Sequence, residues 1–251
     1  MRQIGIEVAT ELETQGLVGR PLFWNRDREQ LLNDLIGILK FDHQREPRGT
    51  VVATELKFGL PDGDFPPLQR KLPSGRTVNF RGSIDRVEKT DAGTLVVVDY
   101  KTGKIDSYKK LSPEDPILGG SQLQLPLYAV AANSYLGQDV NEVHASYWFT
   151  SDSQRWATRG YPVSREVLDA FDEAIDVIVD GIEGGLFPPK PAPSSSRFTG
   201  VGKCVFCDPD ELGTREIEEK WKALSLLDSL GPYTQLRGEG AIAGDEKGDD
   251  E

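Results

Sequence analysis

The spacing of apolar side chains predicts three helices in this chain. Residues 27–40 carry leucine and isoleucine at intervals of three and four, which places these side chains on one helix face. Residues 164–184 repeat that spacing with a stronger separation of apolar and polar faces. A third helix is predicted over about 122–136, whereas residues 1–20 show little periodicity.

Four strands are predicted among these helices. They cover residues 51–59, 76–89, 94–101 and 143–150, and the third is a continuous apolar run, typical of a buried central strand. Short links between the first three strands predict an antiparallel meander. The helix before the fourth strand predicts a crossover with parallel pairing. The expected fold class is therefore α/β, a mixed sheet of about four strands flanked by helices.

Composition divides the chain into four parts. We expect an N-terminal helical segment at 1–50, a core at 51–186, a Pro/Ser-rich connector with a Cys-containing segment at 187–235, and an acidic disordered tail at 236–251.

Charge and cysteine content narrow the class of protein. The chain has 251 residues and a net charge of −12, which argues against binding nucleic acid by charge alone. A bound divalent cation would change that balance locally. No stretch approaches the roughly 18 apolar residues of a membrane helix, so no membrane partner is expected. Two cysteines argue against a disulfide scaffold and for a cytoplasmic protein.

The second and third predicted strands carry the candidate chemistry. Asp85 lies near the middle of the second strand, and Asp99 and Lys101 lie at the end of the third. A tight hairpin would place Asp85 beside Asp99, while Asp99 and Lys101, two residues apart, share one face. Two carboxylates could hold Mg²⁺ against a phosphodiester, and the lysine could orient a water or move a proton. Glu55 is a candidate third carboxylate, and the carbonyl of Tyr100 another metal ligand.

A D-x-K triplet alone has a simpler interpretation, because a structural ion pair perturbs charge without any function. Two further motifs favour a functional site over a structural ion pair. The sequence contains G-x-I-D at Gly82–Asp85, D-Y-K at Asp99–Lys101 and Q-x-x-x-Y at Gln124–Tyr128, in that order. Together they resemble the PD-(D/E)XK nuclease superfamily and, within it, the RecB-type branch with the C-terminal nuclease domain of AddB-like helicase-nucleases. The resemblance covers roughly residues 50–215.

This resemblance implies a restriction-endonuclease-like nuclease core and metal-dependent hydrolysis of DNA, as an exonuclease more than an endonuclease, in repair or recombination. It implies Mg²⁺ or Mn²⁺ as cofactor. The implied metal-binding and catalytic residues are Asp85, Asp99, Lys101 and Glu55, and the implied substrate-binding residues are Gln124, Tyr128 and Arg86. Gln124 and Tyr128 lie four apart, on one face of their helix.

The chain departs from the family pattern in two places. Many relatives carry a G-x-x-x-H motif on an early helix, and His43 lacks that glycine spacing. Relatives with an iron–sulfur cluster supply four thiolates, but this chain has only Cys204 and Cys207, with Gly213 at the expected third position. We therefore expect no complete iron–sulfur cluster and interpret the cysteines as vestigial.

Two hypotheses from different classes remain open. The first is an active DNA nuclease whose partners are DNA and a helicase subunit or domain. The second is a catalytically weak, nuclease-like module that binds DNA or protein within a larger helicase-nuclease assembly. A non-nuclease hydrolase has no nucleophile or phosphate-loop motif to support it.

Overall fold

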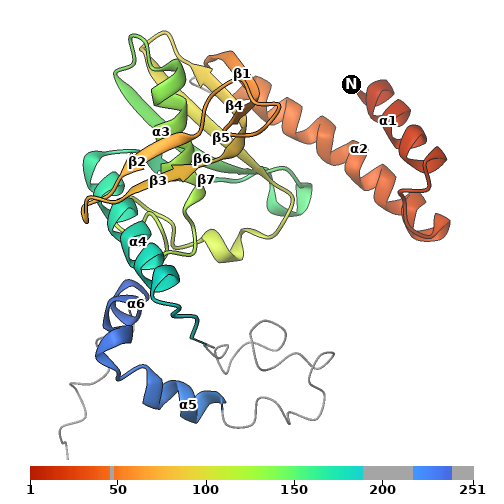
Figure 1. Ribbon diagram of the computed structural model, residues 1–251. Coiled ribbons are helices and arrows are strands. Elements are labelled where there is room, and N and C mark those ends of the chain that lie inside the picture. The colour runs from red at the N-terminus through yellow and green to blue at the C-terminus, as the bar shows by residue number, and fades with distance from the viewer. Residues whose placement is uncertain (46–47, 189–216, 239–251) are drawn as a thin grey trace, which may run out of the picture. The chain divides into compact units, whose positions relative to one another are not determined.

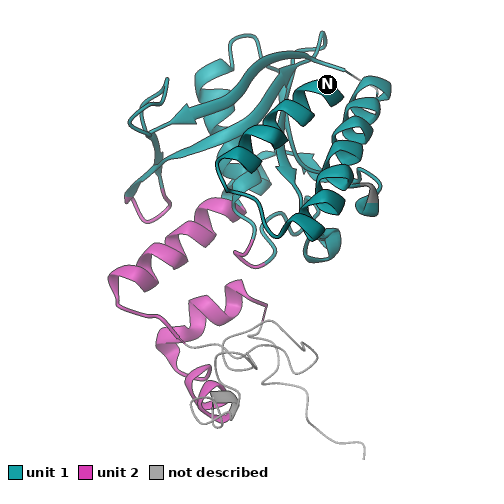
Figure 2. Ribbon diagram, turned by 90° about the vertical axis from the view of Figure 1, so that its right-hand side faces the viewer, with its two compact units in different colours: residues 1–71, 77–118, 122–169 teal, residues 72–76, 119–121, 170–251 magenta. Residues whose placement is uncertain are grey.

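The structure is a computed structural model that describes residues 1–45, 48–188 and 217–238. The chain forms two compact units (Figure 2). Unit 1 comprises residues 1–71, 77–118 and 122–169, and unit 2 comprises 72–76, 119–121 and the described residues from 170 onward. Cys204, Cys207 and most of the predicted acidic tail lie outside the described residues, and the predicted boundaries at 50, 186 and 235 stay predictions.

A five-stranded mixed sheet forms the centre of unit 1 (Figure 1). Its strands, in spatial order, are β1 (Thr50–Phe58), β4 (Gly82–Lys89), β5 (Thr94–Lys101), β6 (Glu142–Phe149) and β7 (Thr158–Pro162). β1, β4 and β5 are antiparallel neighbours, β6 joins β5 in parallel, and β7 pairs antiparallel with β6. The predicted α/β class, the meander and the parallel crossover are confirmed, with five strands instead of about four.

One predicted strand is in fact two. The strand expected over 76–89 divides into β3 (Thr77–Phe80) and β4, which belong to different sheets. β1 ends beside Gly82, so the residues before Gly82 have no partner in the main sheet. They pair instead with β2 (Leu68–Lys71), a strand that lies between the first two predicted strands and was not itself predicted.

Helices cover both faces of the sheet. α3 (Gln124–Leu136) lies on one face, where its Leu125 and Ala129 share a core with Leu95 and Val97. On the other face, Ile38 of α2 (Pro21–Gln44) packs with Val98 and Trp148. Since residues of β5 alternate between these two cores, the strand is buried on both sides, as its apolar run predicts.

An additional helix, α1 (Arg2–Thr14), precedes α2 and packs on it. α1 lies within the N-terminal segment expected to be helical, but the weak periodicity of residues 1–20 did not define it as a separate helix. α1 faces α2 through Gly5 and Ala9: Ala9 is buried, and a Cβ at Gly5 would lie 2.5 Å from Leu32 Cδ2. Such small contact residues give little hydrophobic signal in the sequence.

Unit 2 contains the larger part of α4 (Arg165–Glu183), with α5 (Ile217–Leu224) and α6 (Gly231–Leu236). Within this unit, Arg76 forms a salt bridge to Asp180 of α4 at 2.7 Å, and the Ser74 amide donates to Asp176 at 2.8 Å. The short 3₁₀ helices are Ile105–Tyr108, Asp152–Gln154 and Asp228–Leu230. Among the described helices, none combines the length and apolar character needed to cross a membrane.

Candidate active site

Asp85 lies where the β4–β5 ladder stops. The last paired residues are Arg86 and Val98, so continuing the register would place Asp85 opposite Asp99. Instead of a further strand pair, the Asp85 side chain accepts a hydrogen bond from the backbone amide of Tyr100, with an N–Oδ2 distance of 2.7 Å. One carboxylate oxygen of Asp85 thus fixes the segment that carries Asp99 and Lys101.

β4 is irregular at this point. Ile84 and Val87 are three residues apart but both belong to the core under α3, whereas a regular strand would direct them to opposite faces. Across from this break, Glu55 of β1 has a φ of 49°, in the left-handed region. Such a backbone conformation is uncommon outside glycine and occurs often at functional sites.

Asp99 and Lys101 project from the same face of β5, as predicted. Lys101 Nζ lies 2.6 Å from Asp99 Oδ2 and donates a hydrogen bond to Gln124 Oε1 at 2.9 Å. The same ammonium lies 5.0 Å from the ring centroid of Tyr147, within the range of a cation–π contact. Lys101 is therefore held between a carboxylate, an amide and an aromatic ring.

Asp99 is buried in a setting that disfavours its charge. Only 4% of the residue is exposed, and burial raises the pKa of its carboxyl. The negative charge of Asp85 raises it further, whereas Lys101 acts in the opposite direction. Apart from the ion contact with Lys101, Asp99 Oδ2 meets no hydrogen-bond donor among the described residues. A cation bound between Asp85 and Asp99 would balance their negative charges and give Asp99 Oδ2 a partner.

Gln124 and Tyr128 on α3 form the wall of the site. Burial raises the pKa of the Tyr128 hydroxyl, a hydrogen bond with Gln124 opposes this, and the charges of Asp99 and Asp85 raise it further. The hydroxyl therefore stays protonated. Gly82 explains the glycine of G-x-I-D, because a Cβ there would lie 3.3 Å from the Tyr128 ring.

Glu55 stands apart from these carboxylates. Its side chain is exposed and accepts a hydrogen bond from Ser83 Oγ at 3.2 Å. In the part of the chain that the structure describes, no three His, Cys, Asp or Glu side chains are grouped closely enough to hold a metal ion. The available donor set is two carboxylates and the Tyr100 carbonyl, and Glu55 as a ligand stays a prediction.

Arg86 is engaged elsewhere. Its guanidinium donates to Asp42 Oδ2 at 2.9 Å and to the Tyr100 hydroxyl at 3.2 Å, and it forms a salt bridge with the buried Glu88. It also lies 5.6 Å from the ring centroid of Trp148, in the core of the α2 face. This placement argues against the predicted substrate contact, because the side chain lies on the face of the sheet opposite α3.

Tyr147 is a site residue that the sequence analysis missed. It pairs with Asp99 in the parallel β5–β6 ladder, is fully buried, and donates its hydroxyl to Gln122 Oε1 at 3.3 Å. Parallel pairing of the third and fourth strands was predicted, but not its register. The register, which pairs Tyr147 with Asp99, would have identified Tyr147 as a residue near the candidate site.

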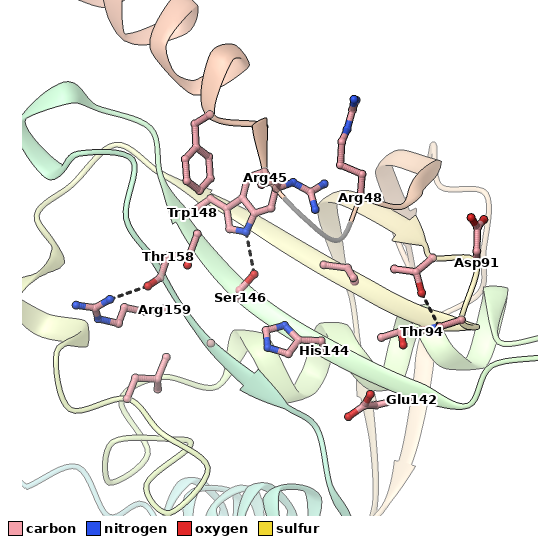
Figure 3. A pocket seen from close by; sticks show the side chains of 16 residues that line it. Arg45, Arg48, Asp91, Thr94, Glu142, His144, Ser146, Trp148, Thr158 and Arg159 are labelled. Atoms are coloured by element: carbon pink, nitrogen blue, oxygen red, sulfur yellow. Dashed lines mark hydrogen bonds between the residues drawn. The ribbon is translucent and has the colours of Figure 1, made fainter. Parts of the chain in front are cut away.

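The α2 face of the sheet has a hollow of its own, a cavity of about 980 Å³ (Figure 3). Its lining includes Arg48, His144, Trp148 and Arg159, and the Trp148 indole donates to Ser146 Oγ at 2.9 Å. Burial lowers the pKa of His144. None of the D-Y-K or Q-x-x-x-Y side chains lines this cavity.

Comparison of the sequence with known proteins identifies the family. The sequence model of the PD-(D/E)XK nuclease superfamily matches residues 6–212. The chain belongs to this superfamily, and its mixed sheet with flanking helices is the restriction-endonuclease-like fold expected from the resemblance.

Curated relatives from several bacteria are each named as a subunit of an ATP-dependent helicase/deoxyribonuclease. The chain is 47% identical to the Clostridium tetani protein over 79 residues, which are 30% of this chain and 6% of that protein. It is 35% identical to the Geobacillus kaustophilus protein over 104 residues (40% and 8%). It is 32% identical to the Desulforudis audaxviator protein over 151 residues (57% and 12%). The matched part thus spans only a small fraction of each relative.

Proposed function

We propose that this chain is a divalent-metal-dependent DNA nuclease that hydrolyses phosphodiester bonds as an exonuclease. The observation that carries the proposal is the buried Asp99 carboxylate, placed between Lys101 and the negative charge of Asp85. A structural ion pair needs only Asp99 and Lys101. The negative charge of Asp85 makes it more costly to bury Asp99 in its charged form, unless a cation binds between the two carboxylates.

The donor atoms suit Mg²⁺ or Mn²⁺. Both ions prefer oxygen ligands, and Mg²⁺ retains several waters and accepts phosphate oxygens. Asp85 Oδ1, Asp99 and the Tyr100 carbonyl would provide the protein ligands, since Asp85 Oδ2 is already used by the Tyr100 amide. When bound, the metal acidifies a water and neutralises charge on the scissile phosphate. Superfamily members generally use divalent metal ions, which supports this assignment.

Lys101 and the α3 residues have separate roles in this proposal. An ammonium has three N–H donors, and Asp99 and Gln124 take two of those on Lys101. The third is available to orient the attacking water. Gln124 keeps Lys101 in place, while the protonated Tyr128 hydroxyl donates to a phosphate oxygen. Glu55 would act as an outer carboxylate through a water molecule.

The setting of the enzyme is also part of the proposal. The relatives are named as helicase/deoxyribonuclease subunits, which supports DNA as substrate, a helicase subunit or domain as partner, and a role in cytoplasmic DNA repair or recombination. With a net charge of −12, the chain alone should hold DNA weakly, so metal and partner would both strengthen binding. No iron–sulfur cluster is part of this proposal.

The test compares cleavage of linear single-stranded, linear double-stranded and covalently closed DNA, with Mg²⁺, with Mn²⁺ and with EDTA. Metal-dependent loss of linear DNA with closed circles intact is the expected result. Asp99→Asn should lose most of this cleavage. Asp106→Asn is its matched control and should cut normally, because Asp106 pairs with Lys109 at 2.6 Å on the exposed surface. If the chain binds DNA but cuts none of these substrates at protein excess, the catalytically weak binding module is the better assignment.

A further inference from the structure

The α1–α2 hairpin carries two rows of exposed aliphatic side chains. Each row repeats every four residues, so each follows one helix face. The rows are Ile4, Val8 and Leu12 on α1, and Leu31, Leu35 and Leu39 on α2; together they are called the aliphatic face. Between 36% and 55% of each residue is exposed.

The two rows adjoin. A Cβ at Gly5, the residue after Ile4, would lie 3.7 Å from Leu35 Cδ1, and Met1 and Leu39 line one small cavity. The opposite side of the hairpin is polar, since Arg2 donates to Glu29 at 2.6 Å and to Asn33 at 3.3 Å. The α2 row therefore borders α1 at the N-terminal end of the α1 row.

The fold does not use the aliphatic face. α2 is already attached to the sheet through Ile38, which is buried with Val98 and Trp148, and α1 is attached to α2 through Ala9 and Gly5. Single exposed leucines are ordinary, but a contiguous aliphatic patch on a soluble domain indicates a surface that another molecule covers.

Acidic side chains border the aliphatic face and restrict its partner. Glu7 and Glu11 follow Ile4 and Val8 by three residues, so each is a neighbour on the helix surface. Neither glutamate forms a salt bridge with any described residue. Among the cations near this face, Arg28 is held by Glu13 at 3.0 Å, and Lys40 lies at one end of the face, where it lines the cavity of Met1 and Leu39. A second copy would bring these glutamates together, and nucleic acid or anionic lipid would bring its own negative charge, so all three are disfavoured.

We propose that the aliphatic face binds an amphipathic protein helix whose apolar ridge is flanked by lysine and arginine. This deepens the proposed function by giving the chemistry of the protein partner. It is tested by binding alone, so a failed nuclease assay leaves it untouched.

The probes are three fluorescent synthetic helical peptides: one with a leucine ridge and lysine/arginine flanks, one with the same ridge and glutamate flanks, and one with basic flanks and serine in place of the ridge. Fluorescence anisotropy measures their binding to the full chain. We expect the basic ridge peptide to bind at least tenfold more tightly than either of the others. Leu35→Asp should abolish the difference, whereas Leu226→Asp, at a leucine that is 75% exposed in unit 2, should preserve it.

The charge requirement has its own variant. Glu7→Lys with Glu11→Lys should reverse the preference between the basic and acidic ridge peptides while circular dichroism stays unchanged. Equal binding of all three peptides overturns the proposal. So does a dimer in sedimentation velocity that Leu35→Asp converts to monomer, because the occupant would then be a second copy.

Discussion

The backbone amide of Tyr100 donates a hydrogen bond of 2.7 Å to the side chain of Asp85, and this bond joins the two motifs of the candidate site. G-x-I-D and D-Y-K are adjacent in space because β4 and β5 form a hairpin. They are held in a fixed geometry because Asp85 accepts that amide just beyond the last strand pair. Asp85 thus has both a positioning role and a proposed metal-binding role.

Asp99→Asn should separate activity from stability. The amide keeps the shape of the side chain but removes the charge that burial and Asp85 disfavour. DNA cleavage should fall by about 10²-fold or more, while the melting temperature without metal stays the same or rises. Cleavage assays and thermal unfolding of the same preparation measure both. An inactive variant that is also much less stable would indicate a structural role for Asp99.

Lys101→Met should give a different combination of effects. The substitution removes the ammonium that competes with a metal for Asp99, so Mn²⁺ should bind at least as tightly as in the wild type. Cleavage should still fall, by roughly 10²–10⁴-fold, if Lys101 orients the attacking water. Isothermal titration with Mn²⁺ tests the expected metal affinity, and single-turnover cleavage tests the expected loss of rate. Loss of metal binding would assign Lys101 to building the site instead of to the reaction. Lys109→Met is the matched exposed control.

Gly82→Ala should disturb Tyr128 without changing any polar group. The new Cβ would lie 3.1 Å from Phe58 Cζ and 3.3 Å from Tyr128 Cε1, so both rings must shift. A cost of about 1–3 kcal/mol in the free energy of unfolding is expected from such overpacking, with a several-fold loss of cleavage. Urea unfolding and cleavage rates measure these. Gly103→Ala should be neutral in both assays, because a Cβ at Gly103 would lie more than 4 Å from every atom outside its neighbours in the chain.

The site could be predicted from the sequence more completely than its surroundings. The apolar run at 94–101 defined β5, and two-residue spacing correctly placed Asp99 and Lys101 on one face. β7 was not predicted because it lacks an apolar pattern: it needs Gly160, where a Cβ would lie 2.1 Å from the Ala145 carbonyl oxygen. The face occupied by Arg86 was also not predictable, since it depends on the break in alternation between Ile84 and Val87.

The position of Arg86 leads to a prediction about stability. Arg86 and Arg45 share the carboxylates of Asp42 and Glu88, and both guanidinium groups lie against Trp148. Arg86→Met should therefore lower the free energy of unfolding by about 3–5 kcal/mol, the usual cost of removing one partner of a buried ion pair and leaving the other charge uncompensated. It should leave the KM for DNA unchanged. A raised KM in a normally stable variant would restore Arg86 as a substrate contact.

The same cluster sets an acid limit to folding. Burial alone would raise the pKa of Asp42, but hydrogen bonds from Arg45 and Arg86 hold that pKa below its ordinary value of 3.8. Because the folded pKa is the lower one, the stabilisation is complete above pH 3.8 and is lost as pH falls through the folded pKa. Asp42→Asn should lower stability near neutrality and remove this part of the acid dependence. Urea unfolding of the wild type and Asp42→Asn, from neutral pH to below pH 3.8, measures how their free energies of unfolding depend on pH. If the two pH dependences run parallel, Asp42 does not contribute to the loss of stability in acid.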